Sequence, residues 1–446
     1  MHGHTLRNWN HSASSHPAVI ANPRNLDELI GIIKDHEKYP SPVTVAGHLH
    51  SMNACFETTG TQLLLRQFND VRVDVDAKTV TVGANVDMIG IRNAVNRHGM
   101  QTEVTPEIGN ATAGSVACSG TKDASIGSGL GQISSTVVGV RMVNAQAEVE
   151  TITVESDPDK LHLIRSSYGL LGVIFEVTFG IQGGLLLNYR YGSFPLDRLP
   201  AHDRIFDGAD GVLAFLLPYS NRILVERRFL AAPGAPISRL SKLKRWLRDR
   251  LWENVASWLT TRFQFNRFYY VMDRLILVWI LTLHRTGGFR AQRDDSMINF
   301  KSRRTHYFDF TFWAVPISRW QDYVRAYVQF CKDYERRTGF RCSLPAEVYF
   351  MSRDAHSLLS PSPDEAVFTM DSVDTRMNDP LWIEFNRRYN EFAADFGARP
   401  LLNQTKQLSR AIVAKTLGAN WERFVALRRQ YDPDERFLNS FFRELL

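Results

Sequence analysis

Apolar and polar positions alternate along several short segments in the first part of the chain. Residues 71–75 and 79–82 alternate on either side of the polar turn 76–78, and residues 137–143 are followed by an alternating run at 147–152. Alternation of this kind is typical of strands with one buried face, so each pair is predicted to form a hairpin. Two further strands are predicted, at residues 43–45 and near residues 63–65.

Other segments of the same part place their apolar residues at helical spacing. Residues 22–29 have the composition of a capped helix start, and apolar positions follow them. Met88, Ile91 and Val95 mark one face of a helix predicted over residues 86–98. A chain that mixes hairpins and helices in this order favours an α+β domain over a doubly wound parallel sheet.

The second part of the chain also combines strands and helices. Residues 211–217 and 222–229 are predicted to pair as antiparallel strands. Residues 307–315 form another predicted strand, which Pro316 ends. Residues 320–335 show the pattern of an amphipathic helix. A second α+β domain is therefore expected.

Residues 238–286 form a basic insertion in this second part. Residues 239–250 hold six Lys or Arg together with Leu and Trp, a composition typical of a helix that lies on a membrane surface. The apolar run 275–281 is well short of the ~20 residues that span a bilayer, so the membrane hypothesis is peripheral contact. The alternative is an ordinary helical insertion packed on its own domain.

Length and composition narrow the class of protein. A chain of 446 residues is too long for one ordinary core, and 44% hydrophobic with 22% charged residues is typical of a soluble globular protein. The net charge of +6 is modest, and the basic cluster lies beside an apolar run without base-stacking motifs, so nucleic-acid binding is not expected. The four cysteines form no C-x-x-C pair, so neither a metal site nor a disulfide framework is expected. Residues 1–17 contain no apolar h-region, which favours a cytoplasmic protein with, at most, peripheral membrane contact.

Two glycine-rich loops carry the most specific chemistry. Residues 46–52 (A-G-H-L-H-S-M) follow directly on the predicted strand at 43–45. A loop in this position can aim several N–H groups at one anion, and glycine allows the close approach. The second loop, residues 106–131, holds six Gly among small residues, so a long, flat ligand could lie against its backbone. It matches neither a Walker loop nor a Rossmann fingerprint, and the alternative is a mobile Gly/Ser loop.

Three ordered motifs give these loops a family resemblance. Residues 47–51 match G-x-x-H-S, residues 109–114 match G-N-x-T-x-G, and residues 172–179 match a closing strand pattern, G-x-x-x-x-V-T-F. Over residues 15–182 the chain resembles the vanillyl-alcohol-oxidase (PCMH-type) family of FAD enzymes. Within that family it is most similar to the aldonolactone and alditol oxidase branch, and more distantly to the decaprenylphosphoryl-ribose oxidase type.

The resemblance implies a domain plan and an FAD site. Residues 1–182 would form the PCMH-type FAD-binding domain, residues 183–400 an α+β substrate (cap) domain, and residues 401–446 a segment that completes the flavin and substrate site. The residues implied to bind FAD are Ala46, Gly47, His48, Leu49, His50, Ser51, Met52, Pro106, Gly109, Asn110, Thr112, Gly114, Ser115, Gly120, Thr121, Val173 and Ile174.

The resemblance also implies how the flavin is attached. The His of G-x-x-H-S often carries a covalent bond to the flavin, and that residue here is His50. A one-residue ambiguity in the loop keeps His48 as an alternative, and noncovalent FAD beside a polar His50 is the other reading. No cysteinyl link is expected at Cys118, which lies too close to Gly120 for that pattern.

Two motifs imply residues that act on the substrate. Residues 345–349 resemble the branch's E-x-R strand, with Glu347 in place and Tyr349 replacing the Arg. Glu347 is thus implied at the substrate hydroxyls, unless it is an exposed strand-end carboxylate. A tyrosine in place of the Arg suits an amphipathic or aromatic substrate better than a simple polyol.

The C-terminal segment carries a further pair of motifs. Residues 397–400 resemble the start of G-x-R-P-x-x-x-K, but Gln404 stands at the Lys position and Lys406 follows two residues later. A lysine beside a flavin could stabilise the reduced anion, so Lys406 is favoured as catalytic and Gln404 stays the alternative. Residues 432–439 match the closing D-P-x-x-x-F-L-N.

The leading hypothesis is an FAD-dependent enzyme that oxidises the CH–OH group of a sugar lactone, an alditol or a larger hydrophobic alcohol. Gly120 implies space for O₂ at the flavin and favours an oxidase that forms H₂O₂, although Lys122 and Asp123 replace the family's His-Gly just after it. One alternative is a membrane-associated dehydrogenase or reductase with a lipid-linked substrate and another electron acceptor. The other is a flavoprotein without catalytic activity.

Overall fold

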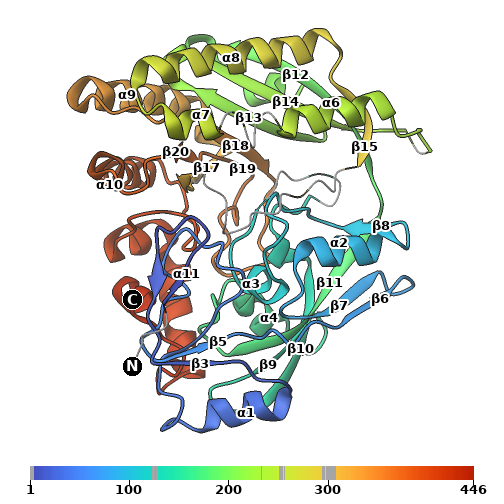
Figure 1. Cartoon of the computed structure of the whole chain (residues 1–446), viewed down its shortest axis with the longest axis vertical. Helices are drawn as coiled ribbons and strands as arrows, with labels where there is room; N and C mark the ends of the chain where they lie inside the picture. Colours follow the sequence, from blue (N-terminus) through green and yellow to red (C-terminus); the bar gives the residue numbers. More distant parts are fainter. Residues whose placement is uncertain are drawn as a thin grey trace.

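The chain folds into two α+β parts stacked along its long axis (Figure 1). The computed structural model describes residues 5–122, 126, 129–232, 234–250, 255, 257–293, 297 and 308–446. The chain leaves the first part where β11 (Val173–Gly183) ends, and it enters the second with β12 (Leu186–Pro195).

Two sheets form the first part. The larger is antiparallel, in the order β10-β9-β11-β7-β6, with β8 paired to the end of β11, and the smaller is a parallel sheet in the order β3-β5-β4. Both predicted hairpins are confirmed, as β6–β7 and β9–β10. The strand expected near residues 63–65 begins two residues earlier. The strands are β3 (Val19–Ala21), β4 (Val43–Val45), β5 (Thr61–Leu63), β6 (Val71–Asp74), β7 (Thr79–Gly83), β8 (Met100–Thr102), β9 (Val137–Val143) and β10 (Val149–Thr153), with a separate pair β1 (Leu6–Arg7) and β2 (Ser14–Ser15).

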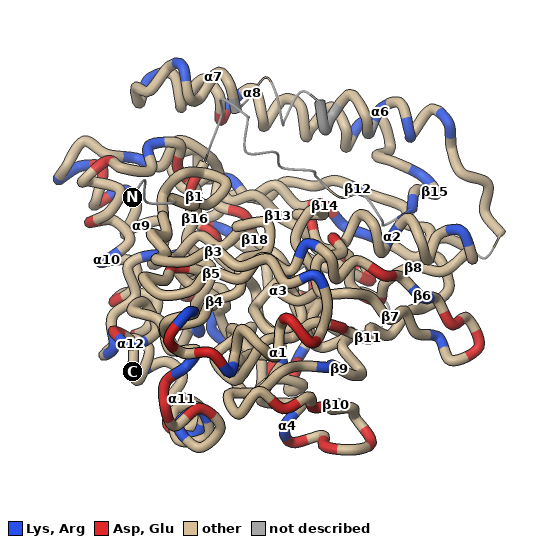
Figure 2. The backbone as a smooth tube through the Cα atoms, turned by 60° about the horizontal axis from the view of Figure 1, so that its bottom comes forward, with Lys and Arg blue, Asp and Glu red and all other residues tan. Residues whose placement is uncertain are grey.

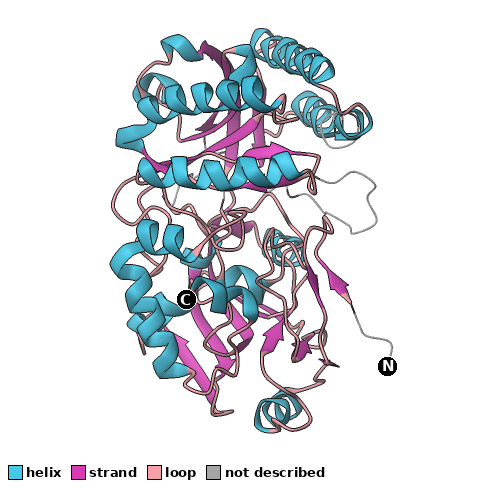
Figure 3. Cartoon of the chain, turned by 90° about the vertical axis from the view of Figure 1, so that its left-hand side faces the viewer, coloured by secondary structure: helices cyan, strands magenta, loops and turns pink. Residues whose placement is uncertain are grey.

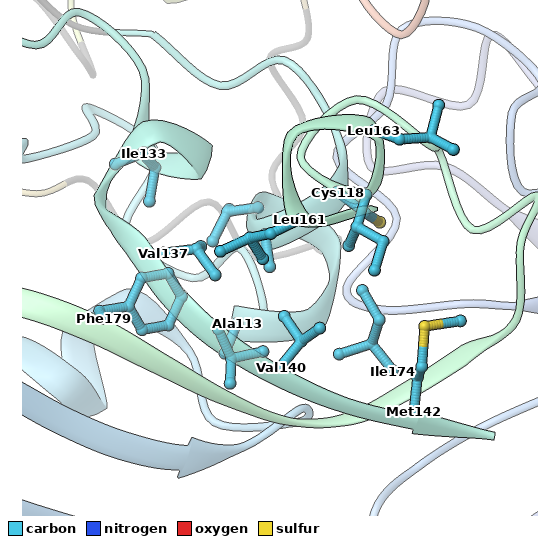
Figure 4. Packing of buried hydrophobic residues seen from close by; sticks show 14 of the residues in the cluster. Ala113, Cys118, Ile133, Val137, Val140, Met142, Leu161, Leu163, Ile174 and Phe179 are labelled. Carbon is cyan, nitrogen blue, oxygen red and sulfur yellow. The ribbon is translucent and has the colours of Figure 1, made fainter. Parts of the chain in front are cut away.

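Helices cover the larger sheet and fill the core beneath it. The side chain of Asn25 accepts a hydrogen bond from the Glu28 N–H and so caps the first predicted helix. Figure 4 shows Ala113 and Cys118 packed with Val140 and Ile174 of the sheet. The helices of this part are α1 (Leu26–Lys34), α2 (Met88–Asn96), α3 (Ala113–Cys118) and α4 (Pro158–Ile164).

The C-terminal segment returns to the first part. The helices α11 (Arg410–Tyr431) and α12 (Ser440–Leu445) place Phe424 and Phe442, both fully buried, in the same core as the sheet residues. Figure 3 shows the helices next to the C-terminus beside the strands of this part. Residues distant in sequence can therefore meet the two glycine-rich loops.

The second part is built on one sheet with helices on both faces. Its strand order is β15-β12-β14-β13-β18-β19-β17, and the predicted β13–β14 pair is confirmed. One face packs on α9 and α10 through residues such as Trp320 and Phe385, and the other packs on α8 through Ile280 and Leu283. The elements are α5 (His202–Phe206), β13 (Gly211–Leu217), β14 (Arg222–Leu230), α6 (Arg239–Arg250), α7 (Ser257–Arg262), α8 (Asn266–Arg285), β15 (Phe289–Arg293), β16 (Asp309–Thr311), β17 (Ala314–Pro316), α9 (Trp320–Thr338), β18 (Ala346–Met351), β19 (Val367–Thr369), β20 (Ser372–Asp374) and α10 (Pro380–Asp395).

The single strand predicted over residues 307–315 is wrong. In its place β16 pairs with β20 and β17 pairs with β19, while Tyr307 lies outside the described residues. Phe312 and Trp313, which separate the two strands, are both fully buried but enter different hydrophobic clusters. Residues 308–312 alternate between Phe and polar residues, a pattern that fits one continuous strand and cannot show this change of partner.

Candidate functional site

A cavity opens where the two glycine-rich loops meet. Its volume is about 1360 Å³, including space open to solvent, and its walls come from β4, the loop after it, α3 and the C-terminal segment. Gly47 brings the loops together, because a Cβ there would lie 2.4 Å from Thr112 Oγ1 and 2.5 Å from Ser115 Oγ. Only glycine allows this approach.

Backbone N–H groups of the first loop are available to a ligand. Leu49 adopts a left-handed conformation with φ of 59°, which turns the chain after β4. Met52 N–H donates to Asn403 O at 2.8 Å, but within the described residues the N–H groups of residues 47–51 donate no hydrogen bond to the backbone. Amides in such a loop suit an anion such as the pyrophosphate of a dinucleotide.

The structure distinguishes the two histidines of this loop. His50 lines the cavity, and neither of its buried ring nitrogens has a hydrogen-bond partner among the described residues. Burial, and then the charge of His48, lowers the pKa of His50 to about 4, so its imidazole is neutral near pH 7. His48 is exposed, lies outside the cavity lining, and places Nδ1 2.7 Å from Asn110 O. Of the two, His50 is the imidazole that can meet a bound group.

The predicted cofactor residues divide into those that line the cavity and those that support it. Val173 and Ile174 show the reason for one such division: neighbouring strand residues point to opposite faces, and only Ile174 faces the cavity. The lining residues are Ala46, Gly47, Leu49, His50, Ser51, Thr112, Gly114, Ser115, Thr121 and Ile174. Those outside the lining are His48, Met52, Pro106, Gly109, Asn110, Gly120 and Val173.

Sequence reasoning missed other parts of the cavity wall. Tyr168 and Gly169 lie a few residues before the closing strand motif, and Phe437 and Asn439 belong to the closing C-terminal motif. Position near or within a motif is therefore the signal that could have found them. Phe310 carries no such signal. Further lining residues are Val43, Thr44, Val45, Asn85, Ile108, Leu170 and Asn403.

Lys406 and Gln404 occupy different places. Gln404 lines the cavity. Lys406 is absent from the lining of this cavity, and its ammonium lies 2.9 Å from Met52 O and 3.5 Å from Asp309 Oδ2. The ammonium of Lys406 thus lies against the loop that carries His50, outside the lining of the cavity.

Gly120 has a packing reason to be glycine. A Cβ at this position would lie 2.4 Å from Leu401 Cδ2, so the space beside Gly120 is filled by a buried side chain. This contact does not support the prediction that Gly120 leaves room for O₂. The neighbouring residues Asp123 and Gly127 of the same loop lie outside the described residues.

A second group of ionisable residues surrounds Glu347. Tyr349 OH donates to Glu107 Oε2 at 2.7 Å and lies 3.3 Å from Glu347 Oε2. The backbones of Glu347 and Asp371 are bonded in both directions, at 2.9 and 3.0 Å. Lys122 Nζ completes the group, 2.7 Å from Asp371 Oδ2. We call these five residues the carboxylate cluster; none of them lines the cavity between the loops.

The cluster shifts the protonation of its own carboxyl groups. Burial, followed by the charge of Glu107, raises the pKa of Glu347 to about 8. Burial raises the pKa of Asp371 to about 6, against the opposing charge of Lys122. A carboxyl group with a pKa near the working pH can take up a proton in catalysis.

Two family models match the chain. The FAD binding domain family matches residues 17–153, and the D-arabinono-1,4-lactone oxidase family matches residues 197–445. The predicted flavin-binding fold is thereby confirmed.

Individual relatives and solved structures extend over the whole chain. An L-gulono-1,4-lactone dehydrogenase of Mycobacterium tuberculosis is 27% identical over 98% of this chain and 98% of its own, and an L-gulonolactone oxidase of Bos taurus is 22% identical over 99% and 98%. A solvent-stable cholesterol oxidase superposes with a TM-score of 0.76 at 16% identity, covering 99% of this chain and 97% of its own. A cholesterol oxidase from Brevibacterium sterolicum gives 0.75 at 14% identity, covering 100% and 97%. These structural matches share the fold.

Proposed function

Because the chain belongs to the D-arabinono-1,4-lactone oxidase family and contains an FAD-binding domain, we propose that it oxidises a CH–OH group of a sugar lactone or a related polyol. At the coarser level it is an FAD-linked oxidoreductase acting on CH–OH donors. The observation that carries the proposal is the cavity between the glycine-rich loops, where the imidazole of His50 has no hydrogen-bond partner among the described residues. The two relatives described above are both named for a lactone, which supports a sugar lactone as the substrate class.

The residues around the cavity fit an elongated dinucleotide. The N–H groups of residues 47–51, which donate to no backbone acceptor in the described part of the chain, would hold the pyrophosphate. The hydroxyls of Thr112 and Ser115, 2.9 Å apart, lie against Gly47 at the same end. Gln404 would face the ligand from the C-terminal segment. Bound FAD supplies the acceptor for a hydride.

Glu347 is the proposed general base. A substrate hydroxyl placed at its carboxylate would give up its proton to Glu347 as the hydride leaves the carbinol carbon and the C=O bond forms. Tyr349, 3.3 Å away, would orient the same oxygen. The raised pKa of Glu347, about 8, means that the base is more fully ionised as the pH rises towards 8.

His50 is the proposed covalent anchor of the flavin. Its imidazole is neutral, buried and without a partner among the described residues, so a ring nitrogen is available to form a bond. The electrons would then pass to O₂, giving H₂O₂, or to another acceptor.

A specific observation favours a second proposal, that the helices α6–α8 bind an anionic membrane surface. Exposed apolar side chains follow the outer face of α8 at Val271, Leu275 and Val278, while Ile280 and Leu283 of the same helix pack on the sheet. On α6, Leu240 and Leu243 are 64% and 55% exposed. Within the described residues no helix combines the length and apolar character needed to cross a bilayer. Surface binding is therefore the mode that these helices fit.

The charge of these helices supports an anionic membrane surface as the partner. Figure 2 shows α6, α7 and α8 along one edge of the molecule with Lys and Arg among them. Among the described side chains of these helices, the one acidic residue is Asp273, which is buried and 2.8 Å from Arg341. The exposed basic residues are Arg239, Lys242, Arg262, Arg267, Arg274 and Arg285. Basic side chains beside apolar ones complement anionic headgroups.

The function is tested on the purified protein by its visible spectrum under anaerobic conditions. Addition of L-gulono-, L-galactono- or D-arabinono-1,4-lactone is expected to bleach the flavin bands, and admission of air to restore them with release of H₂O₂. Bleaching without return in air, but with return on adding an artificial acceptor, would indicate a dehydrogenase. A flavin that no lactone or polyol bleaches would contradict the proposed substrate class.

A further inference from the structure

Lys122 is a buried cation within the carboxylate cluster. Its side chain is 9% exposed, its ammonium is 2.7 Å from Asp371 Oδ2, and the same atom lies 4.1 Å from the centre of the Tyr349 ring. Burying a lysine costs several kcal/mol unless its charge is balanced. The charge of Lys122 is therefore balanced by its neighbours in the carboxylate cluster.

The cluster is connected to the cavity through three chain segments. Ile108, Thr121 and Phe310 line the cavity. Glu107 and Lys122 are immediate neighbours in sequence of the first two, and Lys122 Nζ lies 5.5 Å from the ring of Phe312. Each segment thus contributes one residue to the cavity and another to the cluster or its boundary. The carboxylate cluster is therefore attached to the wall of the cavity through these segments.

The charges around Glu347 come from three segments outside its own strand, whereas β13, which pairs with that strand, places Phe215 opposite Glu347. Glu107, from the loop after β8, and Asp371, which directly precedes β20, both disfavour its ionised form, whereas Lys122, from the loop after α3, favours it. Tyr349 lies on the same strand and favours the ionised form through its hydroxyl group. Lys122 is the single cation among these groups in the described part of the chain.

We propose that Lys122 is the positioning residue that holds Glu347 ready to accept the substrate proton, an inference that rests on the proposed role of Glu347 as base. Its ammonium is fixed by Asp371, whose backbone is bonded to that of Glu347. It thereby offsets the repulsion among three neighbouring carboxyl groups. Oδ1 of the buried Asp371 has no hydrogen-bond partner among the described residues, which leaves an acceptor for a substrate hydroxyl.

Two substitutions that remove charges of opposite sign test this inference, and a third that keeps the positive charge is the control. Lys122→Met removes the cation, so the acidic limb of the kcat/KM profile is expected to move up by about one pH unit, a loss of about tenfold on that limb. Asp371→Asn removes a negative charge, so the same limb is expected to move down. Lys122→Arg keeps the charge and is expected to restore the wild-type limb. A merely structural role would lower the rate in Lys122→Met and Asp371→Asn without moving the limb in opposite directions.

A second readout does not depend on turnover. In pH-difference infrared spectra of the flavin-loaded protein, the protonated-carboxyl band that Glu347→Gln removes is expected to persist to higher pH in Lys122→Met than in wild type. If a folded Lys122→Met variant keeps both the acidic limb of the kcat/KM profile and the protonated-carboxyl band at their wild-type pH, the inference is overturned. A shifted band with no oxidation of any CH–OH donor would keep the electrostatic role of Lys122 and reject the proposed function. If Lys122→Met does not fold, the shift expected in Asp371→Asn decides, and its absence overturns the inference.

Discussion

Gln404 donates a hydrogen bond from Nε2 to the backbone oxygen of Gly120 at 3.1 Å. The Nδ2 of Asn403 donates to the same oxygen at 2.8 Å, and Asn403 O accepts from Met52 N–H at 2.8 Å. Two neighbouring residues of the C-terminal segment thus join the loop after β4 to the loop after α3. The cavity wall is complete only when the end of the chain has folded against its beginning.

Lys406→Met is expected to act on stability. The side chain of Lys406 is 12% exposed and its ammonium faces the fully buried carboxylate of Asp309, so its removal leaves an uncompensated charge. We expect the free energy of unfolding in urea to fall by about 3–5 kcal/mol. Turnover per flavin-loaded, folded molecule is expected to stay within about twofold, a change of under ~0.5 kcal/mol in the barrier.

Lys415→Met is the matched control for this substitution. Lys415 pairs with Asp395 on the surface, with side chains 52% and 69% exposed, so its loss is expected to cost less than about 1 kcal/mol. A large fall in kcat for Lys406→Met at unchanged stability would contradict the structural role and restore the catalytic one.

His50→Ala is expected to abolish flavin that stays with the protein after acid precipitation. His50 lines the cavity with both ring nitrogens unpartnered among the described residues, whereas His48 is exposed and bonded to Asn110 O. His48→Ala, the matched control, is expected to keep the yellow pellet. Mass spectrometry of a proteolytic digest of the wild-type protein identifies the residue that carries the flavin and so tests the same assignment directly. A yellow pellet from His50→Ala, or a colourless one from wild type, would contradict the covalent anchor.

Glu347→Gln is expected to stabilise the fold increasingly between pH 5 and 8. The pKa of Glu347 is raised to about 8, so the folded protein keeps a proton that the unfolded chain loses near its ordinary value of 4.5. The unfolded state then binds fewer protons, and stability falls as the pH rises through this window. A glutamine at this position does not titrate and carries no such dependence, so the difference in Tm between the variant and wild type should widen with pH.

Glu391→Gln serves as the control, because Glu391 is an exposed glutamate on α10. A constant difference in Tm across the window for Glu347→Gln would show that the carboxyl ionises normally. A gain in stability together with lost activity is the expected mark of a functional group held in an unfavourable environment.

Local patterns in the sequence were enough to predict the two glycine-rich loops and the hairpins, but not the sheet and the distant segments that surround the loops. The approach of residue 47 to Thr112 and Ser115 follows from two motifs, each contiguous in sequence, and the hairpins follow from alternation over several consecutive residues. The strands β4 and β5 were predicted, but β3 is too short to show a period, and the parallel pairing of the three strands could not be predicted.

Contacts between distant segments were beyond sequence reasoning. The pair Lys122–Asp371 joins a glycine-rich loop to the edge of β20, and no local pattern relates the two residues. In sequence, Lys122 was a departure from the family pattern; in the structure it supplies a cation beside the Tyr349 ring. The spacing of residues 397–406 likewise could not show which of Gln404 and Lys406 faces the cavity. Their side chains are placed by contacts with distant residues, Gln404 with Gly120 and Lys406 with Met52.

The proposed membrane surface predicts binding to anionic vesicles. Wild-type protein is expected to sediment with vesicles of phosphatidylglycerol and phosphatidylcholine, less with pure phosphatidylcholine, and less again at about 1 M salt, where charges are screened beyond ~3 Å.

The double substitution Leu275→Glu/Val278→Glu acts on side chains that are 55% and 61% exposed, so the fold should tolerate it. Loss of two apolar contacts of roughly 1.5 kcal/mol each predicts at least about a tenfold fall in the partition coefficient. Leu381→Glu on α10, at a residue 37% exposed, is the matched control and should bind as wild type does. Equal binding by the double variant and wild type would reject these helices as the membrane surface, and a wild-type dimer that the double variant abolishes would identify the same face as a contact between two copies of the chain.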